Sequence, residues 1–251
     1  MFLQQSLYCR SLRRLLGKVE RILWLYEELV EPVMGYPRHK ETLASLRGPH
    51  ACYQECLLVE ELESRIADND ICILGPGGYH GSLECDVIGA PEGGIPSIIM
   101  NGLKPLYVTG DLDVDMKLVD AMINLSHMIL VHVHGDNIER ISCYEGRLLG
   151  AKVIYTSQVP THTCTLPIGG FTDGDRALIV AMLFEARRIK VLGYEFTKPI
   201  LTHKSIALDP DVKKVKLKLA RDIIEATAKT LGYLVKVDSG SLTLLRSQYF
   251  M

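Results

Sequence analysis

From Asp70 onward, apolar segments of strand length alternate with segments that have the three- and four-residue apolar spacing of helices. Because helices that join successive strands produce parallel neighbours, this order predicts an α/β fold, with a mostly parallel sheet and helices on both faces. Strands are expected at Ile71–Leu74, Asp86–Ile88, Leu106–Thr109, Met128–Val133, Lys152–Tyr155, Lys190–Gly193 and Leu234–Val237. Helices are expected at Val114–Leu125, Ile138–Leu149, Asp175–Arg188 and Asp211–Leu231, while Pro96–Met100 suits either structure.

The first quarter of the chain precedes this pattern. Leu12–Val30 and Gln54–Ile66 have helical spacing, and Glu31-Pro32 is expected to end the first helix. Met34–Ala51 is predicted to be a linker with a short helix. We therefore interpret residues 1–67 as an N-terminal helical segment with a structural role, and residues 68–251 as an α/β catalytic domain.

Composition narrows the class of protein. Hydrophobic residues make up 47% of the 251 residues, charged residues make up 23%, and the net charge is −2. These values are ordinary for a globular protein and give no sign of a nucleic-acid-binding face. Met1–Arg14 lacks the apolar core of a signal peptide, and no window predicts a membrane span. We expect a cytoplasmic protein without nucleic-acid or membrane partners; a homo-oligomer is compatible with the sequence.

The seven cysteines include no CxxC pair, which argues against a zinc ribbon. Cys72, Cys85 and Cys143 lie in or beside apolar runs and are expected to be core residues. This usage fits a reducing cytosol, although a hyperthermophile can oxidise some pairs.

Three acidic clusters indicate the chemistry. Two of them, Thr109–Asp113 and His132–Asn137, end predicted strands, and the third, Gly169–Arg176, opens a predicted helix. Loops at the carboxyl ends of strands share one crevice in an open α/β sheet. Carboxylates that meet there repel one another unless a cation lies between them, and short oxygen ligands suit magnesium. The clusters therefore predict a magnesium-dependent enzyme that acts on a phosphate substrate.

The first two clusters each contain a pair of potential ligands. Asp111 and Asp113 point the same way in an extended chain and can hold a magnesium ion that bridges phosphates; the alternative is that Asp113 or Asp115 caps the next helix. His132 and His134 also share a strand face and could bind zinc in a metal-dependent hydrolase. Because no third ligand follows at a familiar spacing, we favour His134, Asp136 and Asn137 as polar contacts to nucleotide or metal-bound water.

The third cluster places glycines, aspartates and an arginine at a helix start, where backbone N–H groups attract anions. Arg176 can neutralise phosphoryl charge there, while Asp173 could instead be a plain N-cap. The turn Gly75-Pro76-Gly77-Gly78 is either a phosphate-binding turn or a simple tight turn. One cation of the loop and helix near the C-terminus is expected to reach the site, from the set Lys204, Lys213, Lys216 and Lys218.

Together these motifs resemble a known family, the archaeal 6-hydroxymethyl-7,8-dihydropterin pyrophosphokinases. The resemblance rests on TGDLD, VHVHGDN, TSQ, GGFTDGDRA and the pattern of Lys213, Lys216, Leu217 and Ala220, and it covers Asp70–Leu231. That family is related in fold to the thiamine pyrophosphokinases, whose GDxD motif matches Gly110–Asp113. The resemblance implies ATP-dependent transfer of a diphosphate to the hydroxymethyl group of a reduced pterin, with release of AMP. It also implies that Ile95–Asn101 is helical.

The resemblance implies roles for individual residues. Magnesium and ATP are the expected cofactor and co-substrate, with Asp111, Asp113 and Asp136 as metal ligands, and Asp173 as an alternative to Asp136. Asp173 or Asp175 would accept the substrate hydroxyl proton beside Arg176. Phe171 would stack on the pterin. The remaining predicted contacts to ATP or pterin are Gly75, Gly77, His134, Asn137, Thr156, Gln158 and Lys213.

Two segments depart from the family pattern, Ala90–Gly94 and Gly75–Tyr79, and both are expected to line the nucleotide or pterin pocket. These departures concern the acceptor and not the reaction type. The alternatives are a thiamine pyrophosphokinase, a nucleotide-sugar-binding or glycosyl-transfer module, and a noncatalytic nucleotide sensor.

Overall fold

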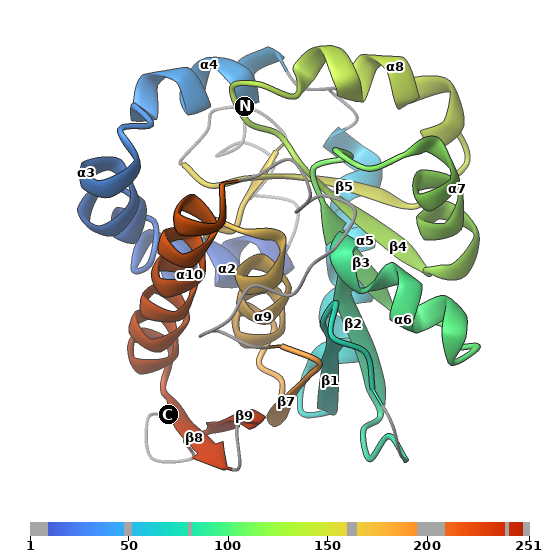
Figure 1. The fold of residues 1–251 in the computed structure, drawn as a ribbon, viewed down its shortest axis with the longest axis vertical. Coiled ribbons are helices and arrows are strands. Elements are labelled where there is room, and N and C mark those ends of the chain that lie inside the picture. The colour runs from blue at the N-terminus through green and yellow to red at the C-terminus, as the bar shows by residue number, and fades with distance from the viewer. Residues whose placement is uncertain are drawn as a thin grey trace.

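The computed structural model describes residues 10–47, 52–79, 82–159, 165–194, 209–238 and 241–247. Within them, a nine-stranded sheet has the order β6-β5-β4-β3-β2-β1-β7-β9-β8 (Figure 1). The strands from β1 to β7 pair in parallel, and β9 pairs antiparallel with β7 and β8. Their bounds are β1 Asp70–Leu74, β2 Val87–Pro91, β3 Tyr107–Gly110, β4 Met128–His132, β5 Val153–Ser157, β6 Leu166–Pro167, β7 Arg188–Leu192, β8 Tyr233–Asp238 and β9 Ser241–Arg246.

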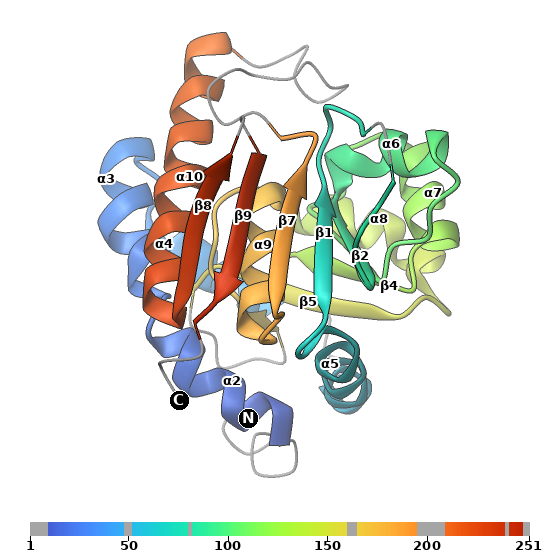
Figure 2. The ribbon, with the colours of Figure 1, turned by 90° about the horizontal axis from the view of Figure 1, so that it is seen from below.

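Helices cover both faces of the sheet, so the predicted fold class is confirmed. One face carries α2 (Arg10–Glu20), α5 (Cys52–Ile66), α9 (Asp173–Leu183) and α10 (Pro210–Leu231). The other carries α6 (Ile95–Met100), α7 (Met116–Leu125) and α8 (Ile138–Leu148). Figure 1 shows α6 and α7 on one side of the strands and α9 and α10 on the other, and Figure 2 shows α9 and α10 running beside β7, β9 and β8.

Alternate strand residues face the two layers, as the two-residue period of a strand requires. Met128 and Leu130 of β4 belong to the core under α9, and Ile129 and Val131 belong to the core under α6, α7 and α8. A strand buried on both faces is apolar at every position, which is why β4 was recognisable in the sequence. The helix expected at Ile95–Asn101 is also present, as α6.

Two strands were not predicted. β6 has only two residues, one of them a proline, and therefore carries no pattern. β9 lies between β7 and the edge strand β8 and pairs antiparallel with both, an arrangement that helix–strand alternation does not reveal. The helix expected at Asp175–Arg188 is shorter, because α9 ends at Leu183 and Arg188 already begins β7.

The N-terminal segment is more broken than predicted. The single helix expected at Leu12–Val30 is instead α2, a turn, a π-helix η1 (Tyr26–Val30) and α3 (Glu31–Met34). Pro32 does not end the helical run, because it lies in the first turn of α3, where a missing N–H is tolerated. Gly35, with φ +66°, ends that helix in the left-handed conformation. The short helix expected in the linker is α4 (Arg38–Arg47).

The N-terminal helices share their core with the sheet. Leu15, Val19 and Ile22 are buried in the same cluster as β1 residue Ile73 and α9 residue Leu178. The division of the chain at residue 67 stays a prediction.

The cysteine prediction was partly wrong. Cys72 is buried in β1 as expected, but it forms a disulfide with Cys85, which lies just before β2. The two Cα atoms are 5.8 Å apart because β1 and β2 are neighbouring parallel strands. Cys143 lies on the exposed side of α8 rather than in the core. Among the residues that the model describes, no helix is long and apolar enough to cross a membrane.

Candidate active site

A cavity of about 450 Å³ lies at the carboxyl ends of β3, β4 and β5. The loops after these three strands and the start of α9 form much of its wall, and the connection from α3 to α4 closes one side. All three acidic clusters contribute to it, as expected for loops at this edge of a parallel sheet. The lining residues are Gly35, Tyr36, Pro37, Lys40, Glu41, Asp111, Asp113, His134, Gly135, Asp136, Gln158, Phe171, Thr172, Asp173, Arg176 and Lys216.

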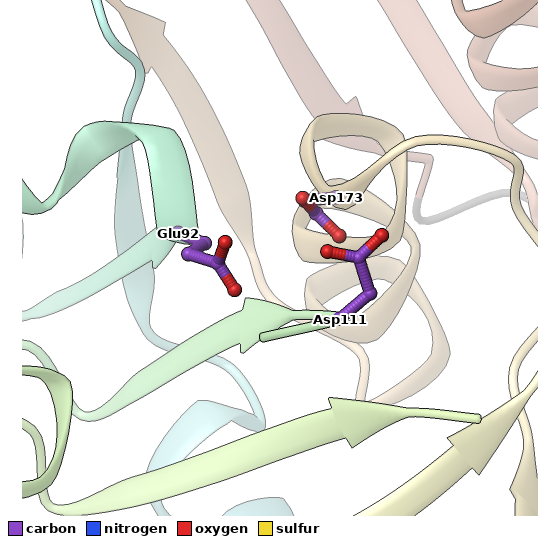
Figure 3. Close-up of side chains that lie close together, drawn as sticks. All are labelled: Glu92, Asp111 and Asp173. Carbon is purple, nitrogen blue, oxygen red and sulfur yellow. The ribbon is translucent and has the colours of Figure 1, made fainter. Parts of the chain in front are cut away.

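Three carboxylates converge at this edge of the sheet. Glu92, Asp111 and Asp173 each offer an oxygen within 4.8 Å of the others, and they form the one candidate metal group among the described residues (Figure 3). Glu92 follows β2, Asp111 follows β3, and Asp173 is the first residue of α9. An all-oxygen donor set of three close negative charges fits a magnesium ion, which would relieve their mutual repulsion.

The backbone around Glu92 is shaped to hold it. Glu92 is fully buried, and its Oε2 accepts a hydrogen bond of 2.9 Å from the backbone N–H of Leu112. A Cβ atom on Gly110 would lie 2.3 Å from that same oxygen, so only glycine fits at the end of β3. Leu112 has a φ of +60° and a buried side chain, which anchors the turn that carries Asp111.

The grouping of carboxylates differs from the predicted one. Asp113 and Asp136 line the cavity, but neither joins the three-carboxylate group. The Asp113 N–H donates to Asp111 Oδ1 at 3.3 Å, so the two residues form a turn rather than the extended pair that was assumed. Sequence reasoning expected Ala90–Gly94 to line the pocket but did not name Glu92 as a candidate metal ligand, although an acidic residue directly after a strand and before two glycines was a usable signal.

The start of α9 separates the roles of its two aspartates. Thr172 is the N-cap, not Asp173, and its hydroxyl and the Asp175 carboxylate form a capping box. Asp175 is buried and accepts hydrogen bonds from the N–H groups of Phe171 and Thr172, at 3.0 and 2.8 Å. Asp175 therefore holds the Gly-Gly-Phe-Thr loop, whereas Asp173 reaches the cavity.

Gly174 and Thr109 fix the position of the start of α9. A Cβ atom on Gly174 would lie 1.8 Å from the Tyr194 hydroxyl oxygen, so glycine is required there. Thr109 donates to the Asp173 backbone carbonyl at 2.8 Å and thereby ties the end of β3 to the start of α9. This bond brings two of the three carboxylates to the same place.

Asp175 leads to a prediction about stability. Burial raises the pKa of its carboxyl to about 7, although Arg176 and the two N–H donors oppose the shift. An unfolded aspartate has a pKa of about 3.9. Between these values the folded state keeps a proton that the unfolded state has lost, so this stabilisation is complete below about pH 4 and is lost as pH rises to about 7.

We expect the unfolding free energy of the wild type to fall from pH 5 to pH 7 more steeply than that of Asp175→Asn, by up to about 1.4 kcal/mol per pH unit. Urea unfolding with EDTA present at both pH values measures the difference. Parallel pH profiles of the two proteins would contradict the assignment.

Arg176 is buried and connects three parts of the cavity wall. Its guanidinium donates to Asp173 Oδ1 at 3.3 Å, to Gln158 Oε1 at 3.1 Å and to the Phe171 carbonyl at 3.1 Å. Arg176 is not a solvated surface arginine, because only 5% of its side chain is exposed. Arg176 thus brings a fixed positive charge to the cavity beside one of the three carboxylates.

Asn137 connects the loops after β3 and β4. Its side chain is buried, donates to the carbonyls of Asp111 and His132 at 3.1 and 2.7 Å, and accepts from the His134 N–H at 3.0 Å. Because these bonds use its polar atoms, Asn137 positions Asp111 and His134 and is not part of the cavity wall. His134 does line the cavity, with Nε2 3.4 Å from Asp111 Oδ2.

Thr156 and His132 lie beneath the cavity. The Thr156 hydroxyl is 3.2 Å from His132 Nδ1, and both side chains are buried. Burial, together with the charge of Arg176, lowers the pKa of His132 well below its usual range, so its imidazole is neutral. Neither residue lines the cavity, in contrast to Gln158, which directly follows β5.

The backbone N–H groups of the predicted glycine turn bond to another loop of the protein. The N–H groups of Gly75 and Gly77 donate to the carbonyls of Leu192 and Gly193, both at 2.8 Å. A Cβ on Gly75 would lie 2.4 Å from the Tyr194 ring, so this glycine allows two loops to pack closely. Neither glycine lines the cavity.

Among the described members of the predicted set of lysines, one lines the cavity, but it is not the lysine that was assigned to ligand binding. Lys216 lines the cavity, with its Nζ 5.7 Å from the centre of the Phe171 ring. Lys213, which had been assigned to ligand binding, lies outside the cavity lining, and burial lowers its pKa. Lys204 lies outside the described residues.

The N-terminal segment, which was predicted to have a structural role, also forms part of the cavity wall. Tyr36, Lys40 and Glu41 line the cavity from α4 and the turn before it. Burial raises the pKa of Glu41, while His134, Gln158, Arg176 and the Gly135 N–H oppose the shift. The sequence carried no signal for this placement, because α4 reads as a charged helix with little amphipathic character.

Comparison with known proteins places this geometry in context. No family model matches the chain. Three curated archaeal proteins named 6-hydroxymethyl-7,8-dihydropterin pyrophosphokinase are similar to it. The protein of Methanothermobacter thermautotrophicus is 26% identical over 219 residues, which is 81% of this chain and 93% of that protein. The protein of Pyrococcus furiosus is 29% identical over 216 residues, covering 80% and 90%. The resemblance to this family is confirmed.

The protein of Methanocaldococcus jannaschii is 29% identical over 144 residues, which is 53% of this chain and 59% of that protein. The shared name describes a pyrophosphokinase, so the predicted enzyme class, a transferase, is also confirmed.

Proposed function

We propose that this protein transfers a diphosphate group from ATP to the hydroxymethyl group of 6-hydroxymethyl-7,8-dihydropterin and releases AMP. The observation that carries the proposal is the convergence of Glu92, Asp111 and Asp173 beside the buried cation Arg176 in one cavity. Phosphoryl transfer needs both a metal site and a fixed positive charge near the phosphates. The names of the three archaeal relatives support the same reaction.

Glu92, Asp111 and Asp173 would hold magnesium. When bound, the ion would neutralise phosphate oxygens and stabilise the charge that develops on the departing AMP. His134 and Asn137 keep Asp111 in place, and Thr109 keeps Asp173 in place. Asp113 and Asp136 also line the cavity and would contact the solvent shell of the phosphates.

Two positively charged side chains, Arg176 and Lys216, would lie near the transferred diphosphate group. Arg176 is held by Gln158 and the Phe171 carbonyl, so its charge needs no reorganisation when phosphates arrive. Lys216 approaches the same cavity from α10. Of the two aspartates considered as proton acceptors, Asp175 is used in the capping box, and Asp173 lines the cavity but is paired with Arg176 and would hold magnesium, so we assign the role to neither.

The acceptor would lie against the side of the cavity formed by Tyr36, Phe171 and Gln158. The two aromatic rings have centres 6.3 Å apart and are tilted by 44°, so they form an adjoining apolar wall. A planar bicyclic ring can pack against such a wall, with its hydroxymethyl group directed toward the carboxylates. This arrangement supports a pterin as acceptor.

The nucleotide product tests the reaction type. With ATP, magnesium and 6-hydroxymethyl-7,8-dihydropterin, we expect one AMP for each diphosphorylated pterin, because transfer of two phosphoryl groups requires attack at the β-phosphorus. Anion-exchange chromatography measures the nucleotides, and mass spectrometry identifies the pterin product. Thiamine and sugar acceptors in parallel reactions serve as controls. Stoichiometric ADP, or faster turnover of thiamine or of a sugar, would rule the proposal out.

A further inference from the structure

Glu41 is a buried carboxylate in the cavity wall that the proposed chemistry does not use. It comes from α4, only 8% of it is exposed, and it lines the cavity together with Tyr36 and Gln158. It does not belong to the three-carboxylate group. Among the described residues, its Oε2 has no hydrogen-bond partner. A buried carboxylate oxygen without a donor costs free energy, and such an atom in a cavity wall calls for a ligand that supplies the donor.

The groups around Glu41 indicate which kind of ligand would donate a hydrogen bond to its carboxylate. Gln158 and the Gly135 N–H lie on the protein side of the carboxylate. Burial raises the pKa of Glu41, and the nearby Arg176 and His134 oppose that shift; Arg176 also donates to Gln158. Tyr36 and Phe171 provide an apolar wall beside it. The site therefore combines a fixed hydrogen-bond acceptor with a surface for a flat ring.

A 2-amino-4-oxopyrimidine ring has the matching edge. Its 2-amino group and its N3–H are two neighbouring donors that point the same way, and a carboxylate accepts such a pair through both oxygens. We propose that Glu41 recognises this edge of the acceptor ring and thereby determines acceptor specificity, an inference that rests on the proposed function. The carboxylate would turn toward the cavity that it lines so that Oε2 meets one of the two donors.

The other use of a carboxylate here would be proton transfer at the hydroxymethyl group. Glu41 is separate from Asp111 and Asp173, which would hold the magnesium ion, and it lies beside the aromatic wall instead. A recognition role and a proton-transfer role differ in what they change. The first alters the affinity for the ring, and the second alters turnover of the bound complex.

The experiment compares two ring ligands on matched variants. Binding of 6-hydroxymethylpterin and of its analogue without the 2-amino group is measured by calorimetry, with magnesium and a nonhydrolysable ATP analogue present. In the wild type, loss of the 2-amino group should weaken binding by about 10- to 100-fold, because a hydrogen bond to a charged group is lost. Glu41→Gln keeps the shape of the side chain and loses its charge. It should bind both ligands weakly, so the ratio of their two dissociation constants should fall to near one.

Glu28→Gln is the matched control, since it makes the same change at an exposed glutamate of the N-terminal helices. It should keep the wild-type ratio. Thermal unfolding checks each variant, and if Glu41→Gln does not fold, Glu41→Asp takes its place, because the shorter side chain withdraws the carboxylate from the ring and should also reduce the ratio.

The possible outcomes separate this inference from the proposed function. The inference is overturned, and the proposed function stands, if the wild-type protein turns over the pterin and the Glu41 variant keeps the wild-type ratio of the two dissociation constants. A Glu41 variant that binds both rings normally but turns over slowly also overturns it, in favour of proton transfer. A wild-type protein that neither binds nor converts the pterin overturns both.

Discussion

Replacing Asp111 by asparagine is expected to lower turnover at least about a thousandfold while leaving the fold intact. The change removes one charge from a group of three carboxylates whose oxygens lie within 4.8 Å of one another. Loss of a metal ligand at a phosphoryl-transfer site costs several kcal/mol of transition-state stabilisation, and each 1.4 kcal/mol is about a factor of ten in rate. Steady-state production of AMP at saturating ATP, with and without excess magnesium, measures the effect.

Two matched variants make this test specific. Asp113→Asn changes a neighbouring carboxylate that lines the cavity outside the group of three, so its effect should be smaller than that of Asp111→Asn. Asp120→Asn makes the same change on α7, where the side chain is 43% exposed and paired with Arg147, and it should be silent. EDTA should abolish the wild-type activity. Full activity in EDTA, or in Asp111→Asn, would exclude the metal site.

Replacing Arg176 is expected to have the second-largest effect. Arg176→Lys keeps the charge but cannot hold Asp173, Gln158 and the Phe171 carbonyl with one planar group, so turnover should fall about a hundredfold. Arg176→Ala should lower it further and raise the KM for ATP, because the cavity loses its buried cation. Kinetics of both variants over a range of ATP concentrations give the two effects separately.

Arg176→Ala also removes the partner of a buried network, so its stability must be measured alongside its kinetics. Arg147→Ala is the control, since its guanidinium is 40% exposed and pairs with Asp120 at the surface. If a folded Arg176→Ala kept wild-type turnover and ATP affinity, Arg176 would have no part in the site.

Much of the fold was predictable because burial on both faces leaves a strong pattern. β1 is apolar from Ile71 to Leu74, and β4 is apolar from Met128 to Val131. The helices α7, α8 and α10 have the expected three- and four-residue spacing of apolar side chains. The two strands that were missed leave no such pattern. β6 is too short to form a pattern, and β9 is recognisable only through its pairing with β7 and β8.

The site divides in a similar way. The Thr109–Asp113 and Gly169–Arg176 clusters were recognisable because acidic and glycine residues directly follow a strand or open a helix. Their partners were not, since a carboxylate's neighbours depend on how the loops turn. The positive φ of Leu112 turns Asp113 away from an extended pair, and the capping box commits Asp175 to the backbone.

The sequence by itself determined the order of strands and helices, the edge of the sheet where the site forms and the class of chemistry, because these follow from local periodicity and from strand-end motifs. Only the tertiary structure decided that Glu92 joins Asp111 and Asp173, that Lys216 rather than Lys213 reaches the cavity, and that Glu41 forms part of its wall. The physical reason is distance along the chain. Glu41 meets Gly135 and Gln158 through the packing of α4 over the ends of the strands, and no local pattern records a contact between segments so far apart.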